Sequence, residues 1–177
     1  AIAAHYFEHF GRMLKPRDFD AEWDFGNRNR RPPRDPVNAL LSFGYALLAK
    51  ECTVALMADG LDPWWGLFHQ PRHGRPALAL DLMEEFRPLI VDSAVITAIN
   101  PGMVGAGDFT TGASGCALDA SGRKAFISAY EGRLDQLVTH PIFGYRCSWR
   151  AIIRMQARLL SRWLRRDVPE YTGVVTR

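Results

Sequence analysis

Apolar residues recur at intervals of three and four along most of the chain, which is the spacing of one face of an α-helix. The clearest run lies between Asp35 and Gly60 and includes Val37, Leu40, Leu41, Tyr45, Leu48, Cys52 and Leu56. Asp35 is a suitable N-cap, and Pro36 suits the first helical position. Gly60 suits the left-handed residue that follows a helix. The pattern therefore predicts a long helix that begins at Pro36 and ends before Gly60.

Weaker forms of the same pattern predict four further helices, at about 1–13, 77–99, 121–139 and 148–165. Pro88 is expected to kink or restart the second of these, because its ring cannot donate the helical hydrogen bond. Ser121 is a suitable cap for the next helix, and His140–Pro141 would end it. The connecting segments are a basic, proline-rich loop at 15–36, a Gly/Ala/Thr-rich loop at 100–121 and a tail at 167–177. With little strand signal, we expect an irregular all-α fold that forms a single domain over residues 1–177.

The composition is that of an ordinary globular protein. Apolar residues make up 47% and charged residues 23% of the 177 positions. Cys52, Cys116 and Cys147 form no close pair, which favours free or buried thiols in a reducing cytosol. We find no apolar run long enough to span a membrane and no signal peptide, and we expect a cytoplasmic protein with no membrane partner. The chain opens inside an apolar helix without Met, so we expect that a preceding segment has been removed.

The net charge is only +3, but the charges are unevenly distributed. Positions 136–166 contain seven arginines and no acidic residue. Six of these arginines recur at every fourth position, namely Arg146, Arg150, Arg154, Arg158, Arg162 and Arg166. Each step of four drifts by about 40° around a helix, so the six form a winding cationic band. Such a band fits the phosphates of a nucleic acid; the alternatives are a solvated face, or arginines paired with acids of other helices.

Two further basic segments could also contact phosphates. The first includes Arg28, Arg30 and Arg31, and its alternative is a flexible charged loop. The second places Arg72 and Arg75 shortly after His69. We interpret His73, between them, as a loop histidine.

A histidine and three acids form the strongest candidate site. His69 precedes Asp81, Glu84 and Glu85, and residues three and four apart share one face of a helix. Carboxylates side by side repel one another unless a cation or a basic group lies among them. An imidazole with carboxylate oxygens suits Mg²⁺ or Mn²⁺ beside a phosphate. The alternatives are acids placed near a helix start for its dipole and a hydrogen-bonded structural histidine.

Several segments resemble a known family, the CRISPR-associated endonuclease/integrase, which is the first-numbered Cas protein. The resemblance covers nearly the whole chain. It rests on RPPRDPVNALLSFGY (31–45), GLDP (60–63), GLFH (66–69), GRP (74–76), LDLMEEFRP (80–88), GRK (122–124), GYR (144–146) and the helix at 152–164. It implies that the chain is the C-terminal helical catalytic domain and that the family's N-terminal β-rich domain is absent.

The resemblance implies a role in CRISPR adaptation, in which foreign DNA fragments are inserted into the repeat array by transesterification. It implies double-stranded DNA (prespacer and CRISPR repeat) as substrate, Mg²⁺ or Mn²⁺ as cofactor and a homodimer in the full-length form. It also implies a small ferredoxin-like partner, the second-numbered Cas protein. In the family a Glu, a His and a further acid hold the cation. The latter two fall here on His69 and Glu84, with Asp81 in or beside the site.

The family's first metal Glu would lie immediately before Ala1, so it is missing from this sequence. We therefore expect the isolated chain to bind metal weakly and to have little or no nuclease or integrase activity. Two other functions stay open from the residues alone. One is a non-enzymatic helical module that binds DNA or a partner. The other is an unrelated histidine–carboxylate phosphohydrolase, which would need no arginine band and no salt-sensitive DNA binding.

Overall fold

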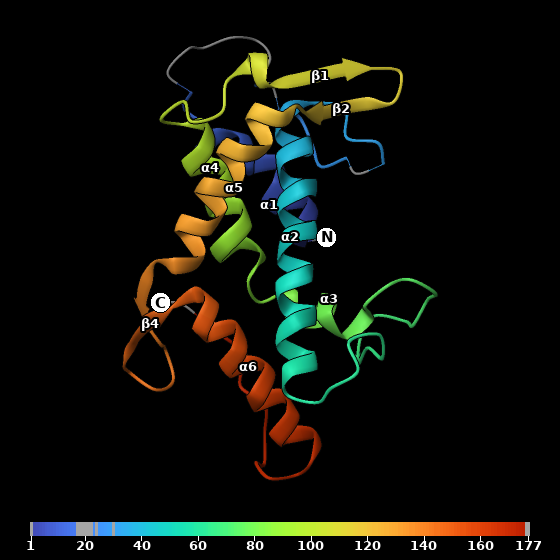
Figure 1. Ribbon diagram of the computed structural model, residues 1–177, viewed down its shortest axis with the longest axis vertical. Coiled ribbons are helices and arrows are strands. Elements are labelled where there is room, and N and C mark those ends of the chain that lie inside the picture. The colour runs from blue at the N-terminus through green and yellow to red at the C-terminus, as the bar shows by residue number, and fades with distance from the viewer. Residues whose placement is uncertain (1, 17–22, 24, 30, 176–177) are drawn as a thin grey trace. The chain divides into compact units, whose positions relative to one another are not determined.

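The computed structural model describes residues 2–16, 23, 25–29 and 31–175, and Figure 1 shows the chain as a ribbon. Its helices are α1 (Ile2–Phe10), α2 (Pro36–Ala58), α3 (Ala77–Met83), α4 (Ser93–Ile99), α5 (Ala120–Asp135) and α6 (Trp149–Leu164). Shorter turns are η1 (Gly11–Met13), the π-helical η3 (Arg87–Asp92) and η4 (Ala106–Asp108). The strands are β1 (Phe109–Gly112), β2 (Gly115–Leu118), β3 (Leu137–Thr139) and β4 (Arg146–Ser148).

Helices dominate, which confirms a helix-rich fold, but the expectation of an all-α fold needs correction. β1 and β2 form an antiparallel hairpin with Gly112 opposite Gly115, inside the segment expected to be a loop at 100–121. β3 and β4 form a second hairpin, so α5 ends at Asp135 and does not continue to His140. Strands of three or four residues contain too few alternations to give a recognisable period in the sequence.

The chain divides into two compact units, each made of two stretches of sequence. The first contains residues 1–44 and 91–132, and the second contains residues 45–90 and 133–177. α2 and α5 each contribute residues to both units. The expectation of a single domain stays a prediction.

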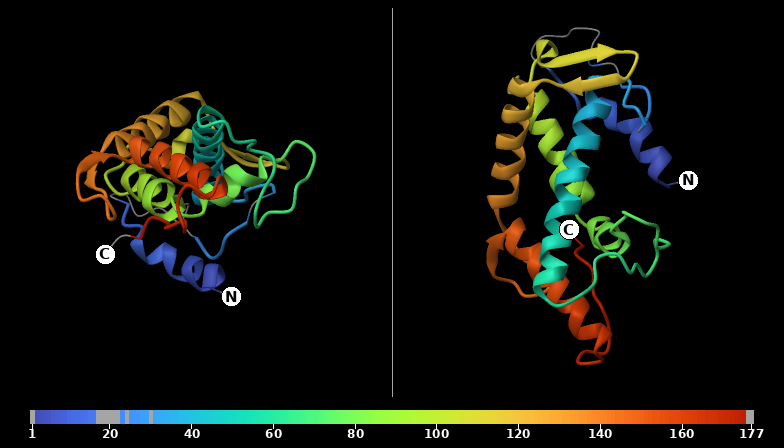
Figure 2. Two further views of the ribbon diagram at one scale, coloured as in Figure 1. Left: turned by 90° about the horizontal axis from the view of Figure 1, so that it is seen from below. Right: turned by 45° about the vertical axis from the view of Figure 1, so that its right-hand side comes forward.

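The first unit is built around the N-terminal half of α2. Its largest fully buried side chains include Phe10, Leu40, Leu41, Ile99, Phe126 and Tyr130. Gly44 allows close packing here, because a Cβ at this position would meet the Val91 side chain at 2.6 Å. The β1–β2 hairpin leads into α5 (Figure 2). The base of the hairpin is closed by the Asp119 N–H, which donates to the carbonyl of Asp108 at 2.9 Å.

The second unit contains the C-terminal half of α2, α3, the β3–β4 hairpin, α6 and the tail. Its fully buried side chains include Leu48, Leu56, Phe86, Ile90, Leu134 and Ile152. α6 begins at the predicted place, because the Ser148 hydroxyl accepts a hydrogen bond from the Ala151 N–H at 3.2 Å. All residues of the candidate site lie in this unit.

The caps explain where the helices begin and end. Asp35 caps α2 as predicted, accepting the Asn38 N–H at 2.8 Å. Gly60 follows α2 at φ 74°, and the Leu61 N–H reaches back to the carbonyl of Leu56. α5 is capped by Asp119 and not by Ser121, since the Asp119 carboxylate accepts the Gly122 N–H at 2.8 Å.

Pro88 interrupts the predicted helix at 77–99, as expected. α3 ends at Met83, and the chain resumes with the wide turn of η3, in which Pro88 is the second residue, before α4 begins at Ser93. This interruption places Glu84 and Glu85 in the short turn between the helical segments.

The length and composition of α2 are relevant to the expectation that no segment of the chain can span a membrane. By length and composition this helix could cross a membrane. Its most apolar 18-residue window has a mean hydropathy of 1.4, and 39% of that window is buried inside the protein. The statement that no apolar run is long enough is therefore wrong. This is weak evidence for a membrane span, because core helices have the same composition, and α2 buries Leu40, Leu48 and Leu56 completely.

Candidate metal centre

Asp81 organises the loop that carries His69. It lies on α3, and its side chain is only 6% exposed. Its carboxylate accepts the backbone N–H groups of Leu67 at 2.6 Å, Phe68 at 3.0 Å and His69 at 3.0 Å. The same carboxylate lies 2.5 Å from Nδ1 of His69. One acid thus folds three consecutive loop residues around itself and fixes the imidazole.

The surroundings of Asp81 keep it ionised. Burial by itself raises the pKa of its carboxyl group. The hydrogen bonds from the Phe68 N–H, the His69 ring, the His69 N–H and the Leu67 N–H outweigh burial, and the pKa falls below its usual value of 3.8. Asp81 is therefore an acceptor at neutral pH, with its oxygens already engaged.

The contact with Asp81 determines which nitrogen of the His69 ring carries the hydrogen. A carboxylate can only accept, so the proton in this contact belongs to Nδ1 of His69. Nε2 of the neutral ring then carries the lone pair and is the atom that can bind a metal. The side chain is 29% exposed, so it remains accessible. A carboxylate that orients a ligand histidine in this way is a recurrent feature of protein metal sites.

Glu84 follows α3 directly and is 49% exposed. Both of its oxygens lie 2.9 Å from Nη1 of Arg87. Arg87 also lies over the ring of Tyr45, 4.4 Å from its centroid. Burial lowers the pKa of Arg87, but Tyr45 and Glu84 outweigh it and the pKa is raised. The half-exposed carboxylate is thus anchored on one side and can bind a cation on the other.

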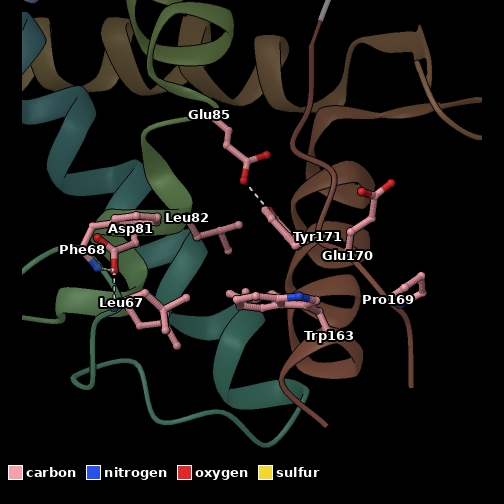
Figure 3. A pocket seen from close by; sticks show the side chains of 11 residues that line it. Leu67, Phe68, Asp81, Leu82, Glu85, Trp163, Pro169, Glu170 and Tyr171 are labelled. Carbon is pink, nitrogen blue, oxygen red and sulfur yellow. Dashed lines mark hydrogen bonds between the residues drawn. The ribbon is translucent and has the colours of Figure 1, made fainter. Parts of the chain in front are cut away.

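Glu85 has entirely different partners. Its carboxylate accepts the Tyr171 hydroxyl, Nε2 of Gln156 at 3.2 Å and the Val174 N–H at 2.8 Å. Figure 3 shows Glu85 pointing to Tyr171. The pKa of Tyr171 is raised by burial and by the charge of Glu85. Glu85 therefore holds the tail, and the expectation that all three acids form one cluster is wrong.

A pocket of about 610 Å³ lies beside these acids in the second unit. Its walls come from the 67–68 loop, α3, α6 and the tail (Figure 3). The apolar part includes Leu67, Phe68, Leu82 and Trp163, while Asp81 and Glu85 contribute carboxylates. Phe68 is 89% exposed, which is unusual for a large aromatic side chain.

The arginine band is partly occupied by ion pairs. Arg150 binds Glu51 at 3.1 Å and Asp135 at 3.2 Å, and Arg158 binds Asp59 at 3.2 Å. These ion pairs agree with the alternative interpretation of the band, in which its arginines pair with acids of other elements. The remaining expected members are exposed, namely Arg146, Arg154, Arg162 and Arg166. Nucleic-acid contact by the band stays a prediction.

The other predicted phosphate contacts also stay predictions. Arg28 donates to Asn38 Oδ1 at 2.6 Å and to the Ser42 hydroxyl at 3.0 Å, so it holds its loop against α2. Arg31 is exposed, and Arg30 lies outside the described residues. Arg72 is exposed at the start of a tight turn closed by the Arg75 N–H, which donates to the Arg72 carbonyl at 3.0 Å.

Sequence reasoning missed three partners of the candidate acids. Arg87 could have been found, because it lies three residues after Glu84 on a helical spacing. Gln156 and Tyr171 had no comparable signal, since they meet Glu85 from 71 and 86 residues away. His69 and Asp81 are in contact, but within the described ranges no close group of three potential ligand atoms includes His69, Asp81 or Glu84.

The fold and the site define a helix-rich protein with a histidine–carboxylate candidate metal centre. Residues 1–132 match the family described as CRISPR associated protein Cas1. The chain belongs to the Cas1 family. A Cas4/Cas1 fusion of Geobacter sulfurreducens is 58% identical over 100% of this chain and 32% of that protein. A Cas1 endonuclease of Thermus thermophilus is 45% identical over 97% of this chain and 50% of that protein.

Solved structures support the same assignment. A casposase bound to integration product has a TM-score of 0.84 at 30% identity, covering 95% of this chain and 46% of that chain. A Cas1 protein from Thermotoga maritima has a TM-score of 0.80 at 26% identity, covering 93% and 51%. A Cas6-RT-Cas1–Cas2 complex matches with a TM-score of 0.79 at 28% identity, covering 97% and 18%. The chain spans about a quarter to a half of the length of the curated relatives it matches.

Proposed function

We propose that this chain provides the histidine and one acid of a metal-dependent DNA endonuclease/integrase that acts in CRISPR adaptation. The reaction would insert foreign DNA fragments into the repeat array by transesterification. The observation that carries the proposal is the contact of Asp81 with Nδ1 of His69, which leaves Nε2 for a cation. The fold of the casposase bound to integration product supports the reaction class.

The residues present fit a hard divalent cation, Mg²⁺ or Mn²⁺. Glu84 offers a half-exposed carboxylate, and His69 offers a neutral nitrogen whose other side is held by an acid. Carboxylate oxygens suit both metals, and an added imidazole is well accepted by manganese. The cation, when bound, supplies positive charge that stabilises charge developing at a phosphodiester.

The protein's own groups have separate roles in this proposal. Asp81 holds the ring orientation and the Nδ1 proton of His69, so it is a positioning residue. Glu84 is a ligand whose direction is fixed by Arg87. Arg87 also keeps a positive charge beside the site when no cation is bound, which offsets the carboxylate charge.

The remaining partners are proposals drawn from the relatives. The casposase was solved with an integration product, and two neighbouring structures are complexes of Cas1 with Cas2. We therefore propose double-stranded DNA (prespacer and repeat) as substrate and a small Cas2 protein as partner. We further propose a homodimer for the full-length protein and a cytoplasmic location.

We also propose that this chain alone does not complete the catalytic site. Within the described residues, His69 and Glu84 belong to no close group of three potential ligand atoms. We propose that a further ligand comes from residues outside these 177, since the curated relatives extend well beyond the part that matches this chain. The isolated chain is therefore expected to have little nuclease or integrase activity.

A non-enzymatic binding module is the second candidate, favoured by the exposed arginines of α6. The test is an integration assay with purified full-length protein, its Cas2 partner, Mn²⁺ and labelled DNA. His69→Ala and Glu84→Gln should each abolish strand transfer while DNA binding in a gel-shift assay is retained. The matched controls are His73→Ala, an exposed histidine of the same loop, and Glu170→Gln, an exposed acid of the tail. Full strand transfer by both site variants would leave the binding module as the better account.

A further inference from the structure

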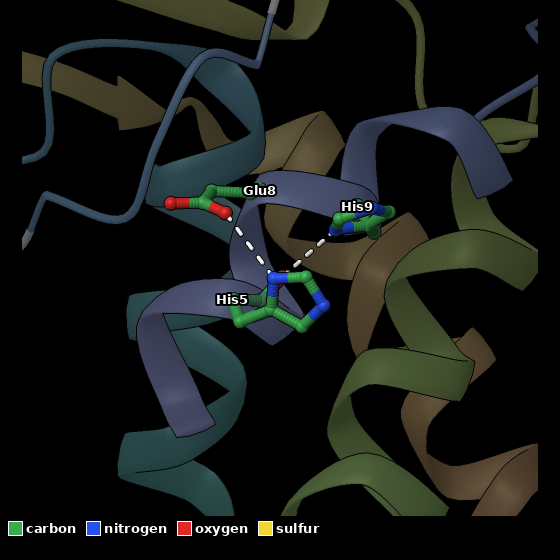
Figure 4. Close-up of side chains that lie close together, drawn as sticks. All are labelled: His5, Glu8 and His9. Carbon is green, nitrogen blue, oxygen red and sulfur yellow. Dashed lines mark hydrogen bonds and ion pairs between the residues drawn. The ribbon is translucent and has the colours of Figure 1, made fainter. Parts of the chain in front are cut away.

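α1 presents two histidines and one glutamate on a single exposed face (Figure 4). His5, Glu8 and His9 stand at helical positions i, i+3 and i+4, which brings their side chains together. Among the described residues, they are the one group of histidine, cysteine or acidic side chains with three potential ligand atoms within 4.8 Å of one another. We propose that this face of α1 is a binding site for a transition metal ion, Zn²⁺.

The contact between His5 and Glu8 already has the spacing of two ligands on one zinc ion. Nδ1 of His5 lies 3.4 Å from Oε2 of Glu8. Ligand atoms bound at about 2.0–2.1 Å to a tetrahedral zinc ion are separated by roughly 3.4 Å. An ion could therefore lie between these two atoms with little movement of either side chain.

His9 is oriented by the helix itself. Its Nδ1 lies 3.0 Å from the backbone carbonyl of His5. A carbonyl can only accept, so Nδ1 carries the hydrogen and Nε2 of the neutral ring carries the lone pair. The His5 and His9 rings are close, with centroids 4.5 Å apart. Metal-bound histidines commonly donate their other N–H to a backbone carbonyl in this way.

The ligand set selects the kind of metal. Two imidazole nitrogens and one carboxylate oxygen are typical zinc ligands, whereas Mg²⁺ is bound mainly by oxygens. The side chains of His5 and Glu8 are 75% and 63% exposed, so water can occupy a fourth position. This differs from the site of His69 and Glu84, whose proposed cation is hard. The two sites should therefore respond to different ions.

Binding would also stabilise α1. With nine residues, α1 is shorter than isolated helices that persist in water. On its other side, the Tyr6 hydroxyl donates to Asp92 at 2.8 Å. An ion that joins positions i and i+4 binds only the helical form, so it shifts the equilibrium toward the ordered helix.

The test is calorimetric titration of ZnCl₂ into the reduced chain, with circular dichroism to confirm that each variant is folded. His5→Ala and His9→Ala should each weaken zinc binding by at least roughly tenfold, the scale on which even indirect partners of a metal matter. Glu8→Gln should weaken it less, because the two imidazoles remain. His73→Ala and His69→Ala are the matched controls and should retain the binding.

Two results would overturn the proposal. One is equal zinc affinity in the wild type and in the His5→Ala and His9→Ala variants. The other is loss of zinc binding in His69→Ala with retention in His9→Ala, which would assign the ion to the loop of His69. In a second measurement, ZnCl₂ should raise the thermal midpoint of the wild type and leave that of His9→Ala unchanged. A rise of the same size in both proteins would also contradict the site.

Discussion

Glu84 and Glu85 are consecutive in the sequence, yet their carboxylates have different partners. Glu84 contacts Arg87 at 2.9 Å and is half exposed, whereas Glu85 is partly buried and accepts the Val174 N–H of the tail at 2.8 Å. One acid is therefore available as a ligand and the other is structural. Substitutions at the two positions should therefore separate an effect on metal binding from an effect on stability.

The first prediction concerns this pair. Glu84→Gln should lower the metal affinity of the full-length protein and change its free energy of unfolding little, since the side chain is half exposed. Glu85→Gln should reduce the free energy of unfolding by about 1–3 kcal/mol, because charge-assisted hydrogen bonds are lost. Manganese titration and urea unfolding measure the two effects. Equal stability loss in both variants would contradict the assignment.

The tail contact gives a second prediction. The Tyr171 hydroxyl donates to Glu85, and burial together with this charge raises the pKa of Tyr171. Tyr171→Phe should destabilise the protein by roughly 1–3 kcal/mol in urea unfolding. In the double variant with Glu85→Gln the losses should not add, because the two residues share one interaction. Simple additivity would show that the tail is held by other contacts.

The third prediction follows from the lowered pKa of Asp81. A carboxyl group whose folded pKa lies below its unfolded value stabilises the fold above the unfolded pKa. That contribution is lost as the pH falls through the folded pKa, below 3.8. Asp81→Asn should therefore be less stable than the wild type at neutral pH, and the difference should shrink on acidification. A difference that is constant from neutral pH to about pH 3 would contradict this origin.

The fourth prediction separates the arginines of α6. Arg154 is exposed, whereas Arg150 is bound by Glu51 and Asp135. Arg154→Ala should weaken DNA binding by the full-length protein and reduce the salt slope by about 1, as expected for loss of a phosphate contact. Arg150→Ala should act mainly on the free energy of unfolding. Fluorescence anisotropy at several salt concentrations, with urea unfolding, distinguishes these outcomes. An unchanged salt slope in Arg154→Ala would exclude that residue from DNA contact.

Local signals in the sequence were enough to predict the helices. The cap at Asp35, the left-handed Gly60 and the interruption at Pro88 each depend on neighbouring residues. The hairpins were missed because their strands contain only three or four residues. The cap of α5 was misplaced because Asp119 and Ser121 are both good capping residues, and only the backbone geometry selects Asp119.

The candidate site was predictable in part. The helical spacing of Asp81, Glu84 and Glu85 can be recognised from neighbouring residues in the sequence. The residues that each acid contacts cannot be recognised in this way. Glu85 is bound by Gln156 and by the tail, which come from distant sequence positions. The role of Asp81 depends on how the loop at 67–69 folds around it. Such long-range pairings carry no period or spacing that a single sequence reveals.

We propose that His69 and Glu84 hold a catalytic cation only together with a further ligand that these 177 residues do not supply. Manganese titration by calorimetry should be made on the isolated chain, on the full-length protein and on full-length His69→Ala. We expect tight binding in the full-length protein and weak binding in the other two. Equal affinity in the isolated chain and the full-length protein would contradict the proposal and would place the complete ligand set within these residues.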